Sequence, residues 1–286
     1  MKNSLCNIIF WERVRYTMKL FLSIITINRN NVAGLERTIQ SVIRQTSTNF
    51  EYIIIDGASD DGSVEMIKKH TSNIKYWISE PDTGIYNAMN KGISKAQGEY
   101  CLFLNSGDWL IAPETLENVL KEITGNLSDI FYADIKTSTD KISRYPKKLT
   151  IDYLLRKTIS HQNSLIKRSL FIEHGLYNEN LIVSSDWEFF LKEFWEYKST
   201  FYHLETNIAF FELAGISSQR SIITVETAIV LKNIFNELAL PLIEYTSFRR
   251  TIYYRIFAEC GEPRLLKFLL KLYRFLFKAC KKVNMH

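Results

Sequence analysis

FEYIIIDGASDDGSVEMIKKH, residues 50–70, places a strand, a turn and a helix in direct succession. Residues 50–56 form a continuous apolar run rich in isoleucine, which predicts a strand buried on both faces. Residues 63–70 predict a helix. Three carboxylates, Asp56, Asp60 and Asp61, lie between the two, although a strand that only fills a core has no need of them. The acidic turn therefore either caps the helix or forms the rim of a binding site.

The same alternation of strand and helix continues along the N-terminal part of the chain. Strands that alternate with helices pair in parallel, so we expect an α/β layered domain with a mostly parallel central sheet flanked by helices. Ligands of such domains bind beyond the C-terminal ends of the strands. The predicted strands are 19–28, 50–56, 74–79 and 99–105, and the predicted helices are 32–45, 63–70 and 84–96. The strand ends are all polar or acidic: Thr26–Asn28, Asp56–Asp61, Glu80–Asp82 and Asn105–Asp108.

Beyond Pro113 the pattern is mixed and no internal repeat is present. We expect an N-terminal extension (1–17), a layered domain (18–220, with halves 18–108 and 109–220) and a helical C-terminal region (221–286). Met18 precedes the first strand and is either the real start or the end of a loose extension. Further predicted elements are strands at 129–134 and 207–212, a strand leading into a short helix at 161–175, a helix at 186–196, and nearly continuous helix over 221–283.

The composition is that of a globular protein, with 46 % hydrophobic and 23 % charged residues in a chain of 286. The sequence contains no run of 18 apolar residues, so it predicts no membrane span. The formal charge of +5 is uneven: residues 248–286 hold ten Lys and Arg against two Glu and sum to +8, so residues 1–247 sum to −3. This distribution argues against a nucleic-acid surface and for a local anionic partner. The scattered cysteines favour a reducing cytoplasm: Cys6, Cys101, Cys260 and Cys280.

Four motifs in order resemble the family-2 inverting glycosyltransferases of the GT-A fold. They are SIITINRN (23–30), IIIDGASDDGS (53–63), SEPDTGIYNAMNKGI (79–93) and GEYCLFLNSGDWL (98–110), and the resemblance extends over about residues 19–220. It implies transfer of a sugar from a nucleotide diphosphate, preferably a UDP-sugar, to an acceptor hydroxyl with inversion. It also implies a cytoplasmic, peripheral-membrane enzyme of bacterial type that extends a surface polysaccharide or a lipid-linked oligosaccharide.

The first two strand ends are the candidate nucleotide site. The hydroxyl of Thr26 and the amide of Asn28 can hold a uracil or ribose edge, and the resemblance assigns to Asp56 the uracil N3–H. Asp82 either touches the base or ribose, as the resemblance implies, or caps the helix that begins at Gly84. Two further residues have plainer interpretations. Asp60 and Asp61 are expected to cap the helix at 63, and Asn90 is expected to bond to a neighbouring loop.

LNSGDW, residues 104–109, is the candidate metal site. A Mg²⁺ or Mn²⁺ ion between the phosphates offsets the negative charge that grows on the leaving diphosphate. The resemblance implies a short Asp-rich motif here, but Asn105 replaces its first carboxylate and only Asp108 remains. Asn105 is therefore assigned to the donor site and Asp108 to the metal. The alternative is a plain turn, which Ser-Gly favours.

Inversion requires a general base that deprotonates the acceptor hydroxyl. By resemblance this base is Asp186, in VSSDWEFFLKEF, where the start of a helix favours the ionised carboxylate; Glu188 is the reserve candidate. Ser185-Asp186 is equally a good helix cap. The resemblance also implies that His161 and Gln162 line the donor-sugar or acceptor pocket. In the loop that carries Ala214 and Gly215, the residues expected to reach the diphosphate are Ser217, Ser218 and Arg220.

PRLLKFLLKLYRFLFKACKKV, residues 263–283, has Lys or Arg at spacings of three and four. All these cations fall on one helical stripe with apolar residues around it, which suits a helix in the interface of an anionic membrane. The alternative is a helix that packs on the catalytic domain or on a second subunit of a homo-oligomer.

Two rival functions are weaker. A sugar nucleotidyltransferase shares the layered sheet, but TINRNNVAGLER (26–37) lacks the glycine-rich basic loop that holds a triphosphate. A non-catalytic nucleotide-sugar-binding or membrane-recruitment protein is motivated by the missing metal carboxylate. The sequence also disfavours a dinucleotide dehydrogenase, because no GxGxxG follows the first strand. The donor sugar, the acceptor and the linkage stay open.

Overall fold

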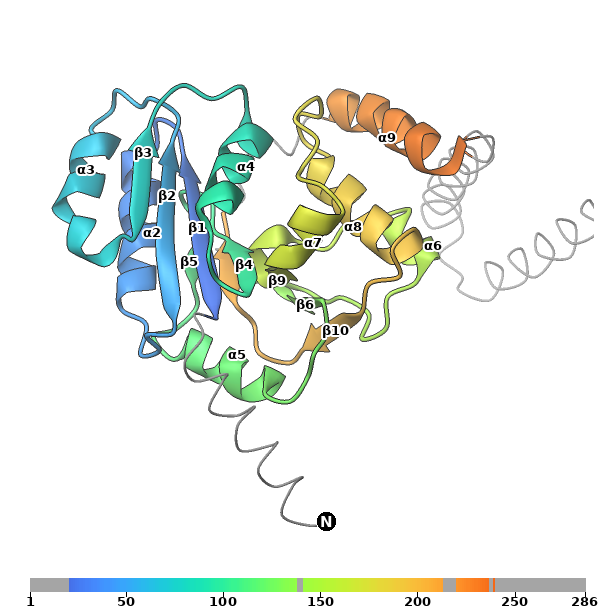
Figure 1. The fold of residues 1–286 in the computed structure, drawn as a ribbon, viewed down its shortest axis with the longest axis horizontal. Helices are drawn as coiled ribbons and strands as arrows, with labels where there is room; N and C mark the ends of the chain where they lie inside the picture. The colour runs from blue at the N-terminus through green and yellow to red at the C-terminus, as the bar shows by residue number, and fades with distance from the viewer. Residues whose placement is uncertain (1–20, 138–140, 213–219, 237–238, 240–286) are drawn as a thin grey trace, which may run out of the picture. The chain divides into compact units, whose positions relative to one another are not determined.

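The structure, a computed structural model, describes residues 21–137, 141–212, 220–236 and 239 (Figure 1). The chain divides into two units, residues 1–227 and 228–286. The fold and the site described below belong to the first unit, and in the second only residues 228–236 and 239 are described. The predicted extension (1–17) and the basic segment (263–283) lie outside the described residues.

A seven-stranded sheet forms the centre of the first unit, in the order β10-β6-β9-β4-β1-β2-β3. Six strands run in one direction and β9 runs against them, so the expected mostly parallel sheet is confirmed. The strands are β1 (Leu22–Asn28), β2 (Phe50–Asp56), β3 (Tyr76–Ser79), β4 (Tyr100–Phe103), β6 (Ile130–Ala133), β9 (Ser164–Lys167) and β10 (Phe201–Leu204).

Helices flank the sheet, as expected for an α/β layered domain. The predicted helices at 32–45, 63–70, 84–96 and 186–196 are present with ends that differ by one or two residues. The helices are α2 (Val32–Ile43), α3 (Ser63–Lys69), α4 (Ile85–Lys95), α5 (Thr115–Ile123), α6 (Ile151–Leu154), α7 (Arg168–Glu173), α8 (Ser185–Trp195) and α9 (Arg220–Phe235), with 3₁₀ turns η1 (Thr71–Asn73) and η2 (His161–Asn163).

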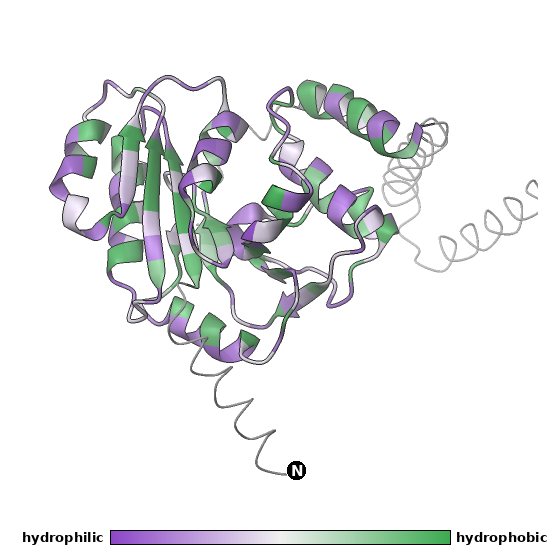
Figure 2. Cartoon of the chain, viewed as in Figure 1, coloured by the Kyte–Doolittle hydropathy of each residue, from purple (hydrophilic) through white to green (hydrophobic). Residues whose placement is uncertain are grey.

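The neighbouring strands β1 and β2 are buried on both faces of the sheet. β1 and β2 pair in parallel from Leu22 opposite Phe50 to Asn28 opposite Asp56, and every β1 residue is buried. Ile24 packs in one core cluster with Leu35 and Ile39 of α2. On the other face Ile25 faces α4, where a Cβ at Gly92 would lie 2.4 Å from its side chain, so only glycine allows this close approach. Figure 2 shows the apolar colour concentrated on these strands.

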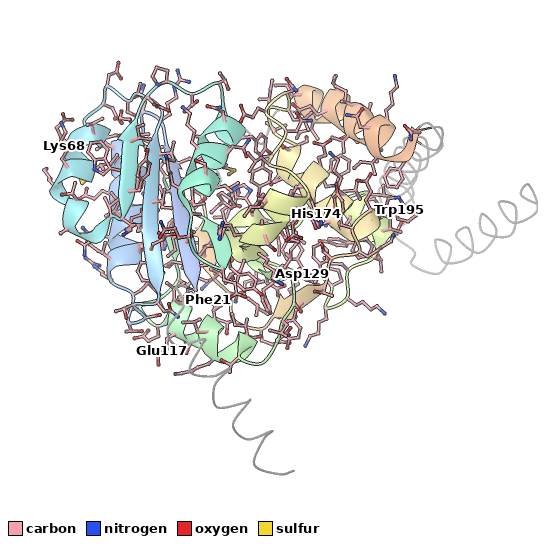
Figure 3. The ribbon with its side chains drawn as sticks, in the orientation of Figure 1. Phe21, Lys68, Glu117, Asp129, His174 and Trp195 are labelled. Atoms are coloured by element: carbon pink, nitrogen blue, oxygen red, sulfur yellow. The ribbon has the colours of Figure 1, made fainter. Side chains whose placement is uncertain are left out.

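The direction of β9 matters for function. Its last residue, Lys167, pairs with Tyr100 at the start of β4, and its first residue, Ser164, pairs with Tyr132 near the end of β6. The 3₁₀ turn η2 that precedes β9 therefore lies at the edge where the parallel strands end. Phe21 and Asp129, labelled in Figure 3, directly precede β1 and β6 and mark the opposite edge.

A second, four-stranded sheet in the order β5-β11-β7-β8 was not predicted as a unit. Aromatic and cationic side chains stack across it: the Trp109 and Phe210 rings are 5.0 Å apart, with Arg37 over Trp109 and Lys136 over Phe210. Its strands are β5 (Trp109–Leu110), β7 (Ile135–Thr137), β8 (Ile142–Ser143) and β11 (Ala209–Phe211). Among the described residues, no helix has both the length and the apolar character needed to cross a bilayer.

Candidate active site

Asp56, at the end of β2, is fully buried and its carboxylate is saturated. Oδ1 accepts from Asn28 Nδ2 (2.7 Å) and Ser59 Oγ (2.6 Å), and Oδ2 accepts from the Ser59 amide (3.0 Å) and Ser79 Oγ (2.6 Å). A carboxylate has about four lone-pair positions, so these four bonds fill it. A nucleotide that used Asp56 directly would have to displace one of these donors, most simply a hydroxyl that can rotate.

The neighbouring residues of β1 differ in what they offer a ligand. Asn28 is buried, and its Oδ1 accepts no hydrogen bond from the described residues. Its Nδ2 donates to Asp56, and this bond identifies the nitrogen and the oxygen of the amide, because only the nitrogen can donate to a carboxylate. Thr26 has no exposed surface, and its hydroxyl lies 3.0 Å from the hydroxyl of Tyr52. The predicted ligand contact of Thr26 stays a prediction.

Asp82 lies directly over the backbone that follows Asp56. A Cβ at Gly57 would be 2.3 Å from Asp82 Oδ2, so a larger residue at this position would displace the carboxylate. Its Oδ1 accepts from the Gly84 amide at 3.0 Å, just before α4, and Arg29 Nη1 is 4.0 Å away with 68 % of its side chain exposed. Asp82 thus supports the helix start and also lies beside Asp56.

The plainer interpretation of the acidic turn applies to Asp61. Its Oδ1 accepts from the amide (3.1 Å) and hydroxyl (2.6 Å) of Ser63, the first residue of α3, and Oδ2 accepts from the Val32 amide (2.7 Å), the first residue of α2. This carboxylate therefore joins two helix starts. Asp60 contributes its amide to Asn30 Oδ1 (3.0 Å).

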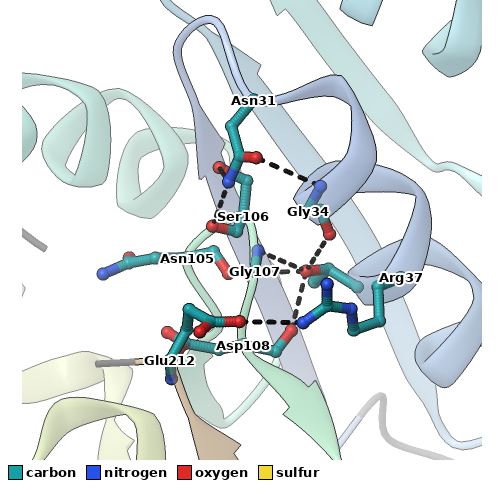
Figure 4. Close-up of polar contacts among 9 residues, drawn as sticks. Asn31, Gly34, Arg37, Asn105, Ser106, Gly107, Asp108 and Glu212 are labelled. Carbon is teal, nitrogen blue, oxygen red and sulfur yellow. Dashed lines mark hydrogen bonds and ion pairs between the residues drawn. The ribbon is translucent and has the colours of Figure 1, made fainter. Parts of the chain in front are cut away.

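The turn from Asn105 to Asp108 is held from both sides (Figure 4). On the α2 side, Thr38 Oγ1 donates to the Asp108 carbonyl (2.7 Å) and accepts from the Gly107 amide (3.0 Å), and Asn31 Nδ2 donates to the Ser106 carbonyl (2.9 Å). The φ of +110° at Gly107 is in the region that favours glycine. The turn is thus a fixed element of the fold.

The other side of this turn is held by Glu212, which follows β11. Its amide donates to Asp108 Oδ1 (3.0 Å), and its carboxylate pairs with Arg37 Nη1 (2.8 Å) on α2. The stack of Arg37 on Trp109 supports the same pair. Asp108 is therefore held between α2 and the residue that follows β11.

The Asp108 carboxyl itself is poorly solvated. It is 3 % exposed, and burial raises its pKa to about 6, a shift that the Glu212 amide and the nearby His161 and Gln162 side chains oppose. Its Oδ2 is buried and has no hydrogen-bond partner among the described residues, and the same holds for Asn105 Oδ1. Unpaired buried oxygens are uncommon and call for a partner that the protein does not supply. No cluster of three or more His, Cys, Asp or Glu side chains in the described part of the chain is arranged to hold a metal.

His161 connects the candidate metal residues to the candidate base. Its Nδ1 lies 2.9 Å from Asp186 Oδ2, and Asn105 Nδ2 lies 3.3 Å from its Nε2. In the neutral tautomer that fits both contacts, Nδ1–H donates to Asp186 and Nε2 accepts from Asn105. Gln162, 4 % exposed, follows on the same turn and accepts from Ser160 Oγ.

Asp186 lies in the first turn of α8 with 12 % of its side chain exposed. Its Oδ1 accepts from the Tyr86 hydroxyl (3.1 Å) and from the Trp187 amide (2.8 Å), and His161 bonds to Oδ2. One lone-pair position on Oδ2 is left. Glu188, the reserve candidate, is 3 % exposed, and its two oxygens are taken by Lys192 (3.1 Å) and Asn178 (3.1 Å).

The structure thus brings the predicted residues together in two groups along one sheet edge. Asn28, Asp56 and Asp82 form the first, and the second consists of Asn105, Asp108, His161, Gln162 and Asp186. The loop after β4 links them, since the Ser106 amide donates to the Ile27 carbonyl in β1 (3.0 Å). Ser217, Ser218, the loop with Ala214 and Gly215, and the side chain of Arg220 lie outside the described residues.

Two contributors were not identified from the sequence. Thr38 lies in a helix as an isolated polar residue, and only its burial between α2 and the 105–108 turn reveals its role. Tyr86 lies in the quoted motif GIYNAMNKG but reads as a core aromatic. The structural bond expected of Asn90 is present, from its Nδ2 to the Tyr177 carbonyl (2.9 Å).

Comparison with known proteins agrees with this fold. An uncharacterised glycosyltransferase of Mycobacterium tuberculosis is 33 % identical over 178 residues, and the alignment covers 60 % of this chain and 68 % of that protein. A PGL/p-HBAD biosynthesis glycosyltransferase of Mycobacterium bovis is 32 % identical over 177 residues, and the alignment covers 60 % of this chain and 69 % of that protein. The crystal structure of S. aureus TarS 1–349 in complex with UDP-GlcNAc shares the GT-A-like fold, with a TM-score of 0.64 and 16 % identity over 85 % of this chain and 77 % of TarS.

The family model for glycosyl transferase family 2 matches residues 23–181, more than half of the chain. The matched region includes both groups of site residues except Asp186. This chain belongs to glycosyl transferase family 2.

Proposed function

We propose that this glycosyltransferase moves a hexosyl or N-acetylhexosaminyl group from a nucleoside diphosphate donor, UDP by preference, to a hydroxyl of a saccharide or lipid-linked saccharide with inversion. One observation carries the proposal: among the described residues, three buried oxygens accept no hydrogen bond, those of Asn28 at the end of β1 and of Asn105 and Asp108 in the turn after β4. A site that offers only unpaired acceptors suits a ligand that brings N–H groups and a cation.

The nucleoside end is assigned to the first group. Because the four positions of Asp56 are filled, Asn28 Oδ1 is the acceptor best able to take an imide N–H such as that of uracil. Asp56 then orients the Asn28 amide, and Asp82, which lies against Gly57, is assigned to the ribose. This arrangement favours a base with a ring N–H and supports UDP.

The residues of the second group fit a divalent cation. Asp108 Oδ2 and Asn105 Oδ1 would hold it, since amide and carboxylate oxygens are both ligands of Mg²⁺ and Mn²⁺. A bound cation neutralises charge on the leaving diphosphate. With two protein oxygens, the remaining ligands have to come from the donor phosphates and water, so we expect the cation to bind together with the nucleotide.

Asp186 is proposed as the general base. His161, Tyr86 and the Trp187 amide donate to its carboxylate and leave one lone-pair position on Oδ2. That position can accept the proton of an acceptor hydroxyl as the hydroxyl attacks the anomeric carbon. Asp186 is linked through His161 to Asn105, which supports a base close to the proposed diphosphate.

The setting of the reaction is also proposed. The name of the Mycobacterium bovis relative refers to PGL/p-HBAD biosynthesis, which supports an acceptor from the glycoconjugates of a bacterial envelope. A basic amphipathic segment at 263–283 would bring the enzyme to the inner face of the plasma membrane. Homo-oligomerisation through this segment is the alternative.

The decisive experiment measures UDP release from a panel of UDP-sugars with Mn²⁺ or Mg²⁺. D186N should abolish turnover and retain UDP binding, while E188Q, on the same helix, should retain turnover. Full activity of D186N would refute the assignment of the base. Nucleotide binding without turnover by the wild type on any donor would favour the non-catalytic alternative.

A further inference from the structure

Helix α4 connects the donor side of the site to the segment that carries the base. It begins three residues after Asp82, and three side chains of its first turns bond to residues 177–186. The contacts are Tyr86 Oη to Asp186 Oδ1 (3.1 Å), Asn87 Nδ2 to Glu179 Oε2 (2.8 Å), and Asn90 Nδ2 to the Tyr177 carbonyl (2.9 Å).

Tyr86 is the member of this set that reaches a reacting group. It is 4 % exposed, and its ring lies 5.5 Å from that of Tyr177 in a buried aromatic cluster. Burial and then the Asp186 charge raise the pKa of its hydroxyl well above the usual value, so the phenol stays protonated and acts as a donor.

The carboxylate of Asp186 is thus held at both oxygens by different elements. Tyr86 from α4 donates to Oδ1, and His161 from η2 donates to Oδ2. The Trp187 amide, from the next residue of the same helix, also donates to Oδ1 (2.8 Å), so Tyr86 and His161 are the two donors that tie the plane of this carboxylate to elements other than α8.

We propose that Tyr86 is a positioning residue for the base: its hydroxyl holds Asp186 so that the remaining lone pair of Oδ2 faces the acceptor hydroxyl. The proposal rests on the proposed function, because it requires Asp186 to be the base. It makes α4 the element that keeps the base in register with the donor-side turn at Asp82. Tyr86 itself touches neither substrate.

The test is Y86F, with Y177F as the matched control. Both tyrosines are buried in the same cluster, but the Tyr177 hydroxyl has no hydrogen-bond partner among the described residues. Y86F should lower kcat by about tenfold or more, the usual effect of losing one bond to a charged group, with KM for the donor unchanged. Y177F should leave both parameters unchanged. A purely structural role would instead change the two variants alike or raise KM.

The single variants separate this proposal from the proposed function, because D186N abolishes turnover and leaves no rate for a second substitution to lower. Unchanged kcat in Y86F overturns the role of Tyr86 even if D186N is inactive. Full activity of D186N overturns the assignment of the base instead. Retained UDP binding shows that each variant is folded.

Discussion

Replacing Asp108 by Asn is expected to stabilise the metal-free protein at neutral pH. The pKa of Asp108 is raised by burial from 3.8 to about 6. Because the folded-state value lies above the unfolded one, the folded state binds more protons between pH 3.8 and about 6. The free energy of unfolding therefore falls as pH rises through this window and levels off above it. At about 1.4 kcal/mol per pH unit, the ionised carboxylate costs up to about 3 kcal/mol at pH 7.

The assay is urea unfolding of the wild type and D108N in EDTA at several pH values from 4 to 7.5. The stability difference should be small near pH 4 and should favour D108N by up to about 3 kcal/mol at pH 7. D129N is a control of opposite sign. Burial tends to raise the pKa of Asp129, but bonds from Thr200 and Lys167 outweigh it and lower the pKa, so D129N should lose stability at neutral pH.

Addition of Mn²⁺ with UDP should reverse the order of stability at pH 7. The wild type gains a ligand for the cation through Asp108 Oδ2, and D108N does not. The desolvation argument is refuted if D108N is less stable than the wild type at pH 7 in EDTA, or if the difference between the two does not change with pH.

Three further predictions concern neighbouring residues. G57A places a methyl group 2.3 Å from Asp82 Oδ2 and should raise the dissociation constant for UDP about tenfold, measured by calorimetry; unchanged affinity would show that Asp82 does not contribute. H161N removes the donor to Asp186 Oδ2 and should lower kcat about 100-fold in the UDP-release assay, while UDP affinity stays the same. T38V removes the hydroxyl that bonds to Gly107 and Asp108 and should lower the free energy of unfolding by about 1–3 kcal/mol in urea; no loss would mean that the turn is held by its other contacts alone.

The parallel half of the fold follows from the sequence because its pattern is strong. Continuous runs such as LSIITIN and FEYIIID are long enough to identify buried strands, and the helices between them force parallel pairing. The strand at 99–105 ends early, at Phe103, because the backbone turns at Asn105–Asp108. β5 and β8 have two residues each and carry no periodic signal, so the second sheet could not be predicted. The direction of β9 is also absent from the pattern, because hydrophobic periodicity does not encode strand direction.

The sequence predicted which residue types form the candidate site and at which strand ends they lie, but it did not predict the contacts between them. Asp56 was identified by its place at the end of β2, yet nothing in the sequence shows that Ser59 and Ser79 fill its lone pairs. The bond between His161 and Asp186 joins residues 25 positions apart and depends on the backward course of β9. These contacts depend on how separate segments pack, which a local pattern does not contain.

β9 extends from the end of the sheet that carries η2 to the end where the parallel strands begin. When chimaeric proteins are built from this chain and a relative, a junction at one end of β9 therefore has a different effect from a junction at the other end. Beyond Lys167, the Arg168 amide donates to the Glu99 carbonyl (2.8 Å) and Arg168 Nε to the Gly98 carbonyl (2.9 Å). A crossover after Lys167 is separated from η2 by the four residues of β9, about 13 Å. It exchanges the whole segment that carries α8 and leaves the turn at His161 intact. A crossover before Ser164 would join the imidazole of one parent to the strand of another. Recombination libraries that aim at new acceptors should therefore splice after Lys167.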